Sequence, residues 1–424
     1  MLANELKNAL LDGALDKYGN IYSDTDKEAK RFLSAIDSFV CAYGEGREIF
    51  VLSVPGRSEI IGNHTDHNGG KVIAGAIDRD IIAIAAKNDD GVIRFHSEGY
   101  PEDTVKLSEI ANKENYKKYS SASLIAGMCE GFLRSGYEIG GFDAYSTTEV
   151  LKGSGLSSSA AFEVMIGNAL NHLYNGGRVE NKRIAELAQF AENEYFGKPC
   201  GLMDQTACAV GGFVYIDFED PASAKIEPLS FSLKDAGYSL CIVNTGGNHA
   251  DLNEDYASVP AEMKRVASLL GRDRLVGLSE EDIIGNIAAL RERAGDRAVL
   301  RSLHFIRENG RVDAARAALK TGDISAFFKC LSESGRSSFE YLQNVYTNKN
   351  VEEQGLSLAL AVTDGRLAGK ECAFRVHGGG FAGTVQAFVR SEELISYARF
   401  MDSVFGDGAA MPLNVRPLGA IRLF

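Results

Sequence analysis

The sequence feature that most constrains the fold is a glycine- and serine-rich run placed directly between a strand pattern and a helix pattern. Residues 142–150 are rich in β-branched and aromatic residues, which favours a strand. Beyond the run, apolar residues recur at positions 162, 166, 169/170 and 173, the spacing of one helix face. Backbone N–H groups at the start of a helix attract an anion, and glycines let the chain approach it closely. The run therefore predicts a phosphate-binding loop formed by Gly153, Ser154, Gly155, Leu156, Ser157 and Ser158.

This run differs from a Walker A loop, because no Gly-Lys-Ser/Thr follows at the required spacing. The alternative interpretation is a flexible glycine–serine linker. Its place between a strand and a helix favours a phosphate loop of another type.

Length and charge limit the class of protein. The 424 residues exceed the size at which a single hydrophobic core stops growing, so we expect two domains. An apolar fraction of 45% and a charged fraction of 24% are those of a folded globular protein. The net charge of −13 opposes phosphate backbones and anionic membrane surfaces, so we expect neither a nucleic acid nor a membrane as partner. A small-molecule partner is favoured.

Targeting signals and cysteine usage favour the cytoplasm. The N-terminal residues are charged and lack the apolar core and cleavage site of a signal peptide. The most apolar stretch, Ile81 to Ala86, is far shorter than the ~20 residues of a membrane helix. The seven cysteines show no paired spacing, and no HExxH or CxxC arrangement supports a transition-metal site. We expect a cytoplasmic protein, whose oligomeric state the sequence does not indicate.

Periodicity divides the chain near residue 220. The first forty or so residues favour helices, and residues 48–54, 71–77, 81–86 and 92–96 favour strands, with Asp90-Gly91 as a hairpin signal. Residues 121–135 and those following Asn181 favour helices again. Residues 221–230 contain prolines and lose periodicity, so we predict domains at 1–220 and 221–424. The second domain begins with a strand at about 238–245, continues with helices and closes with a glycine-rich turn that feeds a strand.

A polar loop between the first two strand patterns carries a second group of candidate residues. It runs from Pro55 to Gly70 and is rich in glycine, asparagine and charge. Its side chains Asn63, His64 and Asp66 offer the mixed donors and acceptors that a sugar requires. Arg57 is suited to hold a phosphate or to lower the pKa of a neighbouring carboxyl group. The alternative is a polar connection without a ligand.

Two carboxylates complete the candidate set. Asp204, in the segment GLMDQ, is suited to orient and deprotonate an attacking hydroxyl near a phosphate loop, or alternatively to cap a helix. Glu192, on the preceding helix, is suited to Mg²⁺, which prefers one or two carboxylates together with phosphate oxygens. The glycine-rich turn at 378–383 is weak evidence by itself.

In this order, the segments resemble one enzyme family. PGRSEIIGNHTDHNGG resembles the galactokinase signature, and GLMDQ resembles the galactokinase segment with the catalytic aspartate. KGSGLSSSAA is similar to the phosphate loop of the GHMP kinases, and GGGFAG to their third motif. The resemblance extends from about residue 48 to 390. It implies an α+β fold with a mixed α/β N-terminal domain containing a left-handed crossover, a ferredoxin-like C-terminal domain, and an active site between them.

The resemblance also implies roles for individual residues. Arg57 and Asp204 match the catalytic pair, and Ser159 and Glu192 match the magnesium ligands. The nucleotide phosphates would lie against residues 153–158. The positions that match sugar contacts are Asn63, His64, Asp66 and Tyr256.

Three of these neighbouring positions depart from the family. Asn63 stands where galactokinases usually have a glutamate that contacts the terminal hydroxymethyl group of the sugar. His67 replaces a tyrosine, and Glu59 replaces an asparagine. The identity of the sugar is therefore less constrained than the reaction.

The resemblance implies an ATP-dependent, Mg²⁺-requiring kinase that phosphorylates the anomeric hydroxyl of galactose. A kinase for another hexose, an amino sugar or a pentose is one alternative, which the asparagine at position 63 favours. A non-catalytic sugar sensor is another, although such a protein would show an eroded phosphate loop or catalytic pair. Both are intact in this sequence, which favours the enzyme.

Overall fold

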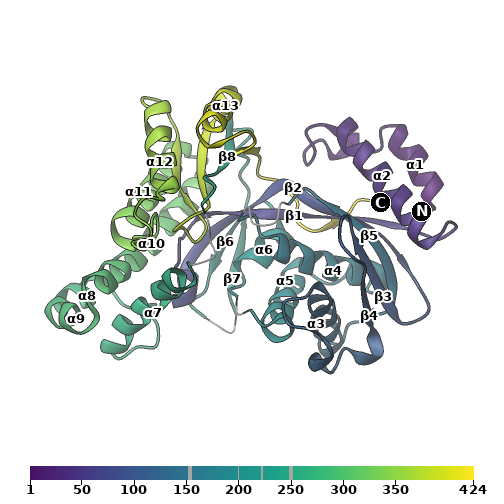
Figure 1. Cartoon of the computed structure of the whole chain (residues 1–424), viewed down its shortest axis with the longest axis horizontal. Coiled ribbons are helices and arrows are strands. Elements are labelled where there is room, and N and C mark those ends of the chain that lie inside the picture. Colours follow the sequence, from purple (N-terminus) through teal and green to yellow (C-terminus); the bar gives the residue numbers. More distant parts are fainter. Residues whose placement is uncertain (151–154, 199, 221–222, 248–251) are drawn as a thin grey trace.

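Long antiparallel strands form the centre of the molecule, with helices on both sides (Figure 1). The computed structural model describes residues 1–150, 155–198, 200–220, 223–247 and 252–424. The longest described strands, β1 (Phe50–Ile61) and β2 (Lys71–Lys87), pair along most of their length and run across the middle of the view. Helices α1 to α6 lie on one side of this view and α7 to α13 on the other.

The larger sheet contains eight described strands. Its order is β12-β1-β2-β5-β3-β4, and β6 pairs with the first part of β2 while β5 pairs with the last part. The predicted strands 71–77 and 81–86 are thus one continuous strand. The other bounds are β3 (Val92–Ser97), β4 (Asp103–Lys106), β5 (Phe142–Thr148), β6 (Phe213–Asp217), β7 (Lys225–Leu229) and β12 (Ile421–Arg422).

Alternate residues of the central strands enter two separate cores. Val51 and Ile84 pack with the N-terminal helices α1 (Ala3–Leu11) and α2 (Thr25–Tyr43), as expected for an N-terminal extension. Leu52 and Ala83 face the opposite layer. Because both faces are covered there, the paired segments 50–52 and 81–86 are apolar without alternation. The opposite layer contains α3 (Ser121–Arg134), α4 (Ser158–Tyr174), α5 (Asn181–Phe190), a π-helical turn (Ala191–Phe196) and α6 (Met203–Val210).

The smaller sheet confirms the expected ferredoxin-like topology. Its four described strands are β8 (Tyr238–Asn244), β9 (Ala373–His377), β10 (Thr384–Arg390) and β11 (Ala410–Leu413). Their spatial order is β11-β8-β10-β9, and all neighbours are antiparallel. In chain order this is 4-1-3-2, as formed by a split β-α-β-β-α-β unit.

Helices of the second half connect the two sheets. They are α7 (Asn253–Leu269), α8 (Glu280–Gly285), α9 (Ile287–Ala294), α10 (Asp296–Thr321), α11 (Ile324–Ser337), α12 (Gly355–Arg366) and α13 (Leu394–Phe405). Among them α10 packs against β2, and α11 packs against both β9 and β1. The second half therefore lies directly on the strand that carries Arg57.

The hairpin prediction at Asp90-Gly91 is wrong. The turn connects β2 and β3, but β5 lies between them, and β3 runs parallel to β5. A turn signal reports the local reversal of the chain, whereas strand pairing is decided by the segment that fills the gap. The loss of periodicity at 221–230 was similarly misleading, because β7 forms there at the sheet edge.

Two segments beyond residue 220 belong to the first sheet. One is β7, and the other is the C-terminal tail, which forms β12 beside β1 and a bridge between Val415 and Ile77. The two chain ends consequently lie near each other beside α1 and α2 (Figure 1). The predicted domain boundary near residue 220 stays a proposal. In that proposal, the C-terminal tail returns from the second domain to the sheet of the first.

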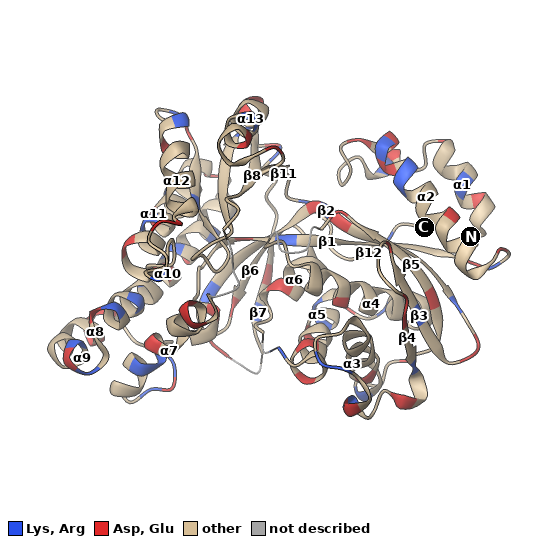
Figure 2. Cartoon of the chain, in the orientation of Figure 1, with Lys and Arg blue, Asp and Glu red and all other residues tan. Residues whose placement is uncertain are grey.

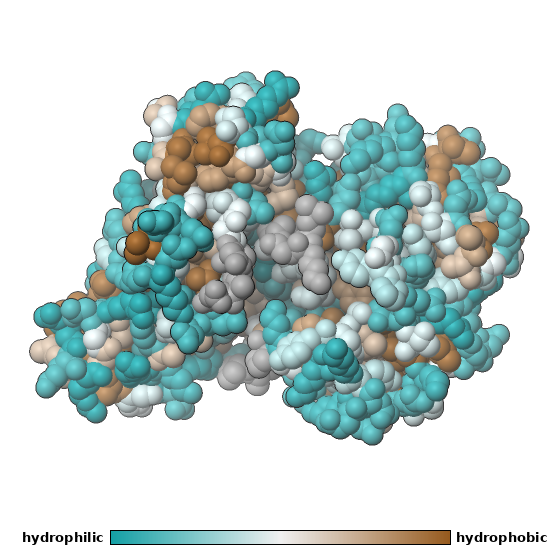
Figure 3. Space-filling view, viewed as in Figure 1, coloured by the Kyte–Doolittle hydropathy of each residue, from teal (hydrophilic) through white to brown (hydrophobic). Residues whose placement is uncertain are grey.

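The surface is mixed in charge and mostly hydrophilic. Acidic and basic residues are interspersed over both halves (Figure 2). Apolar surface gathers over α12 and α13 (Figure 3), where Leu358 and Val404 are exposed. Of the helices in the described ranges, none combines the length and the apolar character needed to cross a membrane.

Candidate active site

Arg57 and Asp204 form a two-pronged ion pair. Arg57 lies within β1, and Asp204 lies in the first turn of α6, which packs on that strand. The Nε and Nη2 atoms of Arg57 donate to the two carboxylate oxygens of Asp204, each at 2.7 Å. Its Nη1 atom donates to the carbonyl oxygen of Gly155 at 2.5 Å. Arg57 thus fixes the plane of the carboxylate and also binds the glycine–serine loop.

The carboxylate is ionised and accessible. Burial raises the pKa of Asp204, but the charge of Arg57 and the hydrogen bonds from Arg57 and Ser157 outweigh it, so the pKa lies below its ordinary value. About 31% of the Asp204 side chain is exposed, whereas the side chain of Arg57 is about 10% exposed. A ligand can therefore reach the carboxylate from the side opposite the arginine.

The described part of the glycine–serine loop leads into α4 beside this pair. Ser157 is left-handed, with φ 58°, and its hydroxyl donates to Asp204 Oδ2. A non-glycine residue in this conformation is strained, and the hydrogen bond offsets part of the cost. Leu156 O accepts from the Arg57 backbone N–H at 3.1 Å. Gly155 and Ser158 are also described, whereas Gly153 and Ser154 lie outside the described residues.

A glutamine joins two buried glutamates next to the predicted magnesium ligands. Gln205 Nε2 donates to Glu192 Oε2 at 2.7 Å and to Glu163 Oε2 at 3.2 Å. Ser159 is half-buried in the first turn of α4, one helical turn before Glu163. Sequence reasoning missed Glu163 and Gln205, although the helical spacing from Ser159 and the segment GLMDQ contain both.

The chemistry of these side chains fits a hard divalent cation. Ser159 and Glu192 supply oxygen atoms, which Mg²⁺ prefers. Among the described residues, Glu163 Oε1 has no hydrogen-bond partner although the side chain is fully buried. Burial, followed by the charge of Glu192, raises the pKa of Glu163. The cluster thus has unused oxygen acceptors and an excess of acidic groups.

Residues 62–68, here called the sugar loop, lie beside the start of the segment that carries Asp204. Asp66 lies against Gly201, since a Cβ atom at Gly201 would lie 2.9 Å from Asp66 Oδ2. A hollow of about 550 Å³ opens there, and its lining includes Asp66, His67, Gly201 and Leu202. The polar loop and the segment GLMDQ, separate in sequence, therefore line one cavity.

His64 anchors the sugar loop to the second half. Burial lowers the pKa of His64 to about 4, so the ring is neutral near pH 7. Its Nε2 atom donates to the carbonyl oxygen of Gly379 at 2.8 Å. With Nε2 committed to that bond, Nδ1 is the nitrogen left to accept a hydrogen bond.

Asn63 does not face a ligand in this structure. Its side chain is fully buried, and its Nδ2 atom donates to Glu59 Oε1 at 3.0 Å and Gly378 O at 2.7 Å. Its Oδ1 atom accepts from Asn344 Nδ2 at 2.7 Å and from Ser338. The amide is used completely by protein groups, so Asn63 would have to give up one of these hydrogen bonds to contact a sugar, and its predicted role stays a prediction.

The glycine-rich turn holds the other predicted sugar residue. Tyr256 donates to the carbonyl oxygen of Gly380 at 2.8 Å and packs edge-on against Phe381. A Cβ atom at Gly379 would lie 2.5 Å from the tyrosine ring. Together with the bonds from Asn63 and His64, three successive carbonyl groups of the turn accept from other segments. The third motif is therefore a clamp for the sugar loop and Tyr256.

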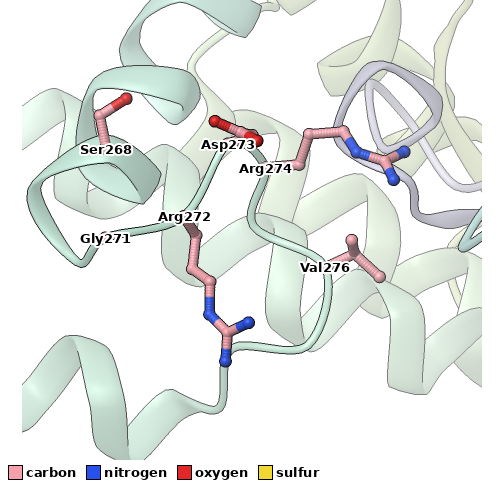
Figure 4. A pocket seen from close by; sticks show the side chains of 6 residues that line it. All are labelled: Ser268, Gly271, Arg272, Asp273, Arg274 and Val276. Atoms are coloured by element: carbon pink, nitrogen blue, oxygen red, sulfur yellow. The ribbon is translucent and has the colours of Figure 1, made fainter.

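Another hollow, of about 510 Å³, lies beyond the end of α7 (Figure 4). Its side chains Arg272 and Arg274 point in different directions. Arg274 donates to the carbonyl oxygen of Glu219 at 3.3 Å. Because these cations do not converge and none of the predicted site residues lines this hollow, we place the candidate site beside Asp66 and Asp204.

Two family models and several curated relatives match this chain. The galactokinase galactose-binding signature matches residues 37–87, and the N-terminal domain of GHMP kinases matches residues 120–212. The chain is 33% identical to the galactokinase of Streptomyces coelicolor over 360 residues, covering 84% of this chain and 88% of the other. It is 30% identical to that of Lactococcus lactis subsp. lactis over 395 residues, covering 91% and 95%.

Solved structures extend the comparison to the fold. Galactokinase from Lactococcus lactis, solved in complex with galactose, superposes with a TM-score of 0.76 and 26% identity, covering 92% of this chain and 100% of the other. A mevalonate kinase has a TM-score of 0.59 at 16% identity, which shows a shared fold alone. The matched signatures, the curated relatives and this fold agree, and the chain belongs to the galactokinase family of GHMP kinases.

Proposed function

We propose that this chain is a galactokinase that transfers the γ-phosphoryl group of ATP to the anomeric hydroxyl of galactose. The observation that carries the proposal is the two-pronged pair of Arg57 and Asp204. Arg57 binds the phosphate loop at Gly155, and Asp204 follows Gly201, which lies beside Asp66 of the sugar loop. The galactokinase relatives, including the galactose complex, support the choice of sugar and ATP.

In this mechanism Asp204 receives the hydroxyl proton. The sugar oxygen forms a bond to the γ-phosphorus, the bond to the leaving ADP oxygen breaks, and the proton passes to Asp204. A carboxylate with a lowered pKa is a weak base. It therefore orients the hydroxyl first and accepts the proton as the bond to phosphorus makes that hydroxyl acidic.

Arg57 and the start of α4 serve the phosphoryl group. The fixed positive charge of Arg57 keeps Asp204 ionised and opposes charge on the transferred group. Backbone N–H groups at the N-terminus of α4, together with residues 155–158 of the loop, would bind the phosphates. These N–H groups require no reorganisation during the reaction, because the helix already fixes them. Gly153 and Ser154, also predicted to bind them, lie outside the described residues.

Ser159 and Glu192 would hold Mg²⁺, with Glu163 beside them. The ion, when bound, neutralises charge on the β- and γ-phosphate groups. Gln205 links the two glutamates by donating to both. We extend the proposal to a cytoplasmic location, which the use of ATP and the seven free cysteines support.

His64, Asp66 and Tyr256 would bind the sugar hydroxyls. Asp66 accepts, and the free Nδ1 of His64 also accepts. The saturated amide of Asn63 is not included. The terminal hydroxymethyl group therefore has to be recognised by other groups.

A coupled kinase assay over a panel of monosaccharides tests the proposal. Galactose should give the highest kcat/KM, and ³¹P NMR should show the product phosphorylated at the anomeric oxygen. A higher kcat/KM for another hexose, an amino sugar or a pentose would replace galactose. If calorimetry shows sugar binding but no sugar is phosphorylated, the protein is a sugar sensor and the proposal of an enzyme fails.

A further inference from the structure

A buried histidine of the smaller sheet lies directly behind the catalytic pair. His377 ends β9 and pairs in register with Thr384, the first residue of β10. The residue is only 2% exposed. Its Nε2 atom lies 3.1 Å from Ser58 Oγ, in the residue next to Arg57, and its Nδ1 atom lies 2.8 Å from Thr384 Oγ1. The mechanism above does not use it.

The neighbouring groups fix the direction of these hydrogen bonds. Gln386 Nε2 donates to the carbonyl oxygen of Ile60 at 3.0 Å, so Gln386 Oε1 is the acceptor for the Ser58 hydroxyl at 3.4 Å. Ser58 Oγ must then accept from His377 Nε2–H. Nδ1 carries no proton in this tautomer and accepts from the Thr384 hydroxyl. One continuous chain results, running from β10 through His377 to β1.

The ring remains in this single tautomer because it stays neutral. Burial, followed by the charges of Arg57 and Arg375, lowers the pKa of His377 to about 3. The ring therefore carries a single N–H proton throughout the pH range in which a cytoplasmic kinase operates. The hydrogen-bond chain depends on geometry rather than on a change of charge.

The same ring lies beside the phosphate loop. A Cβ atom at Gly155 would lie 3.5 Å from His377 Cε1 and Nδ1 and 3.6 Å from Thr384 Oγ1, which is ordinary contact. The carbonyl oxygen of Gly155 accepts from Arg57 Nη1. His377 thus contacts the residue that follows Arg57 and lies beside the loop that receives the guanidinium group of Arg57.

We infer that His377 is a positioning residue for the phosphoryl transfer, and that its Nε2–H, acting through Ser58, holds Arg57 at the angle that aims Asp204. The inference rests on the proposed function. Arg57 and Asp204 are presented by the first sheet and α6, whereas His377 belongs to the second sheet. Correct aim of the catalytic pair therefore depends on close docking of the two sheets. Small misplacements of reacting groups lower kcat, by up to ~10²-fold for about 1 Å.

Two substitutions of the same residue separate this role from packing. In His377→Gln the amide nitrogen takes the place of Nε2 and still donates to Ser58. In His377→Asn the amide reaches only the place of Nδ1, so the link to Ser58 is lost. Both side chains are neutral and smaller than histidine. We expect kcat to fall about tenfold in His377→Asn and to stay within about threefold in His377→Gln.

Ser58→Ala removes the other end of the link and leaves the ring in place. Its kcat should also fall about tenfold, and the double variant with His377→Asn should lose no more than either single variant. KM for the sugar and for ATP should stay within about twofold, because neither substrate touches these residues. His172→Asn, in the last turn of α4, is the control for replacing a histidine far from the site.

Equal kcat values in His377→Asn and His377→Gln, or additive losses in the double variant, would overturn the inference. If His377→Asn fails to fold, as judged by melting temperature, Ser58→Ala decides alone, and an unchanged kcat then overturns it. Wild-type enzyme in the same assay tests the proposed function separately. Should it turn over another sugar instead of galactose, the proposed substrate fails, and the variants are compared with that sugar.

Discussion

Two aspartates near the central sheet, Asp80 and Asp204, are both paired with arginine but differ in how much of the carboxylate is exposed to solvent. Asp80 is 1% exposed, with Arg31 at 2.8 Å from Oδ1 and Arg416 at 3.1 Å from Oδ2. Tyr22 and Ser53 also donate to Oδ2 of Asp80. Asp204 is paired with one arginine and is about a third exposed. An arginine–aspartate pair therefore has a structural role where it is fully buried. It is a candidate catalytic pair where part of the carboxylate is exposed.

The pKa shifts of the two aspartates agree in direction. Burial raises the pKa of Asp80, but the charges of Arg31 and Arg416 outweigh it and leave the pKa below its ordinary value. Asp204 shows the same balance with Arg57. A lowered pKa therefore does not identify a catalytic carboxylate. Access to the carboxylate distinguishes the two residues.

The largest effect on stability is expected from the substitution Asp80→Asn. It leaves the buried Arg416 without its anion and Arg31 with Glu28 as its nearest one, so the free energy of unfolding should fall by about 3–5 kcal/mol. Turnover per folded molecule should stay within about twofold, because Asp80 lies outside the candidate site. Urea unfolding and active-site titration measure the two quantities. A loss below about 1 kcal/mol would remove the contrast with Asp204.

The acid dependence of stability sharpens this result. Because the folded pKa of Asp80 lies below its unfolded value, its stabilisation is fully present above about pH 4 and is lost as the pH falls through the folded pKa. Wild-type protein should therefore lose free energy of unfolding below about pH 4, and Asp80→Asn should lose less over the same interval. Equal slopes in urea unfolding at stepped pH would contradict this reading.

The converse substitution is Asp204→Asn. It keeps the size of the side chain but removes the proton acceptor, and the amide nitrogen cannot accept one of the two hydrogen bonds from Arg57, so kcat should fall by at least ~10²-fold. The free energy of unfolding should change less than in Asp80→Asn, since this side chain is already partly solvated. Steady-state kinetics of the purified, folded variant provide the measurement. Near-normal kcat would exclude Asp204 as the acceptor.

A smaller effect is expected at the predicted magnesium ligands. Ser159→Ala and Glu192→Gln should each raise the Mg²⁺ concentration for half-maximal rate about tenfold. The first loses an oxygen ligand, and the second loses a negative charge and one of two carboxylate oxygens. KM for galactose should hardly move. Glu194→Gln, an exposed position on the same π-helical turn, is the matched control. An unchanged magnesium dependence in both variants would make Ser159 and Glu192 structural.

The smallest effect is expected where Gly201 lies beside Asp66. In Gly201→Ala the added Cβ would lie 2.9 Å from Asp66 Oδ2, so the flexible carboxylate must move slightly. A weakened hydrogen bond of about 1 kcal/mol raises KM for galactose about fivefold, with kcat within about twofold. Gly365→Ala in α12, where a Cβ meets nothing within 4 Å, is the control. An unchanged KM would mean that Asp66 does not bind the sugar.

Sequence reasoning succeeded where function depends on local pattern. The helix after the glycine–serine run and the ferredoxin-like sheet are confirmed. The encounter of Arg57 with Asp204 was expected from resemblance, and the structure brings the two side chains together. Their catalytic roles stay predictions.

Sequence reasoning missed features that depend on residues far apart in the chain. Asn63 is saturated by Ser338 and Asn344, which lie 275 and 281 positions later, and no local signal indicates such partners. The hairpin prediction failed because β5 inserts between β2 and β3. Strand β7, which contains a proline, forms because it extends an existing sheet edge.

The return of the tail to the first sheet sets an order of events during synthesis. Tyr18 donates to the carbonyl oxygen of Leu423, 405 positions later, and β12 completes the edge beside β1. At ~5–20 residues per second, translation exposes that edge for tens of seconds before its partner emerges. The first half must wait with an open sheet edge until residues 415–424 leave the ribosome. Chaperone demand and aggregation should therefore concentrate in this interval, and premature termination should be more harmful than the few lost residues suggest.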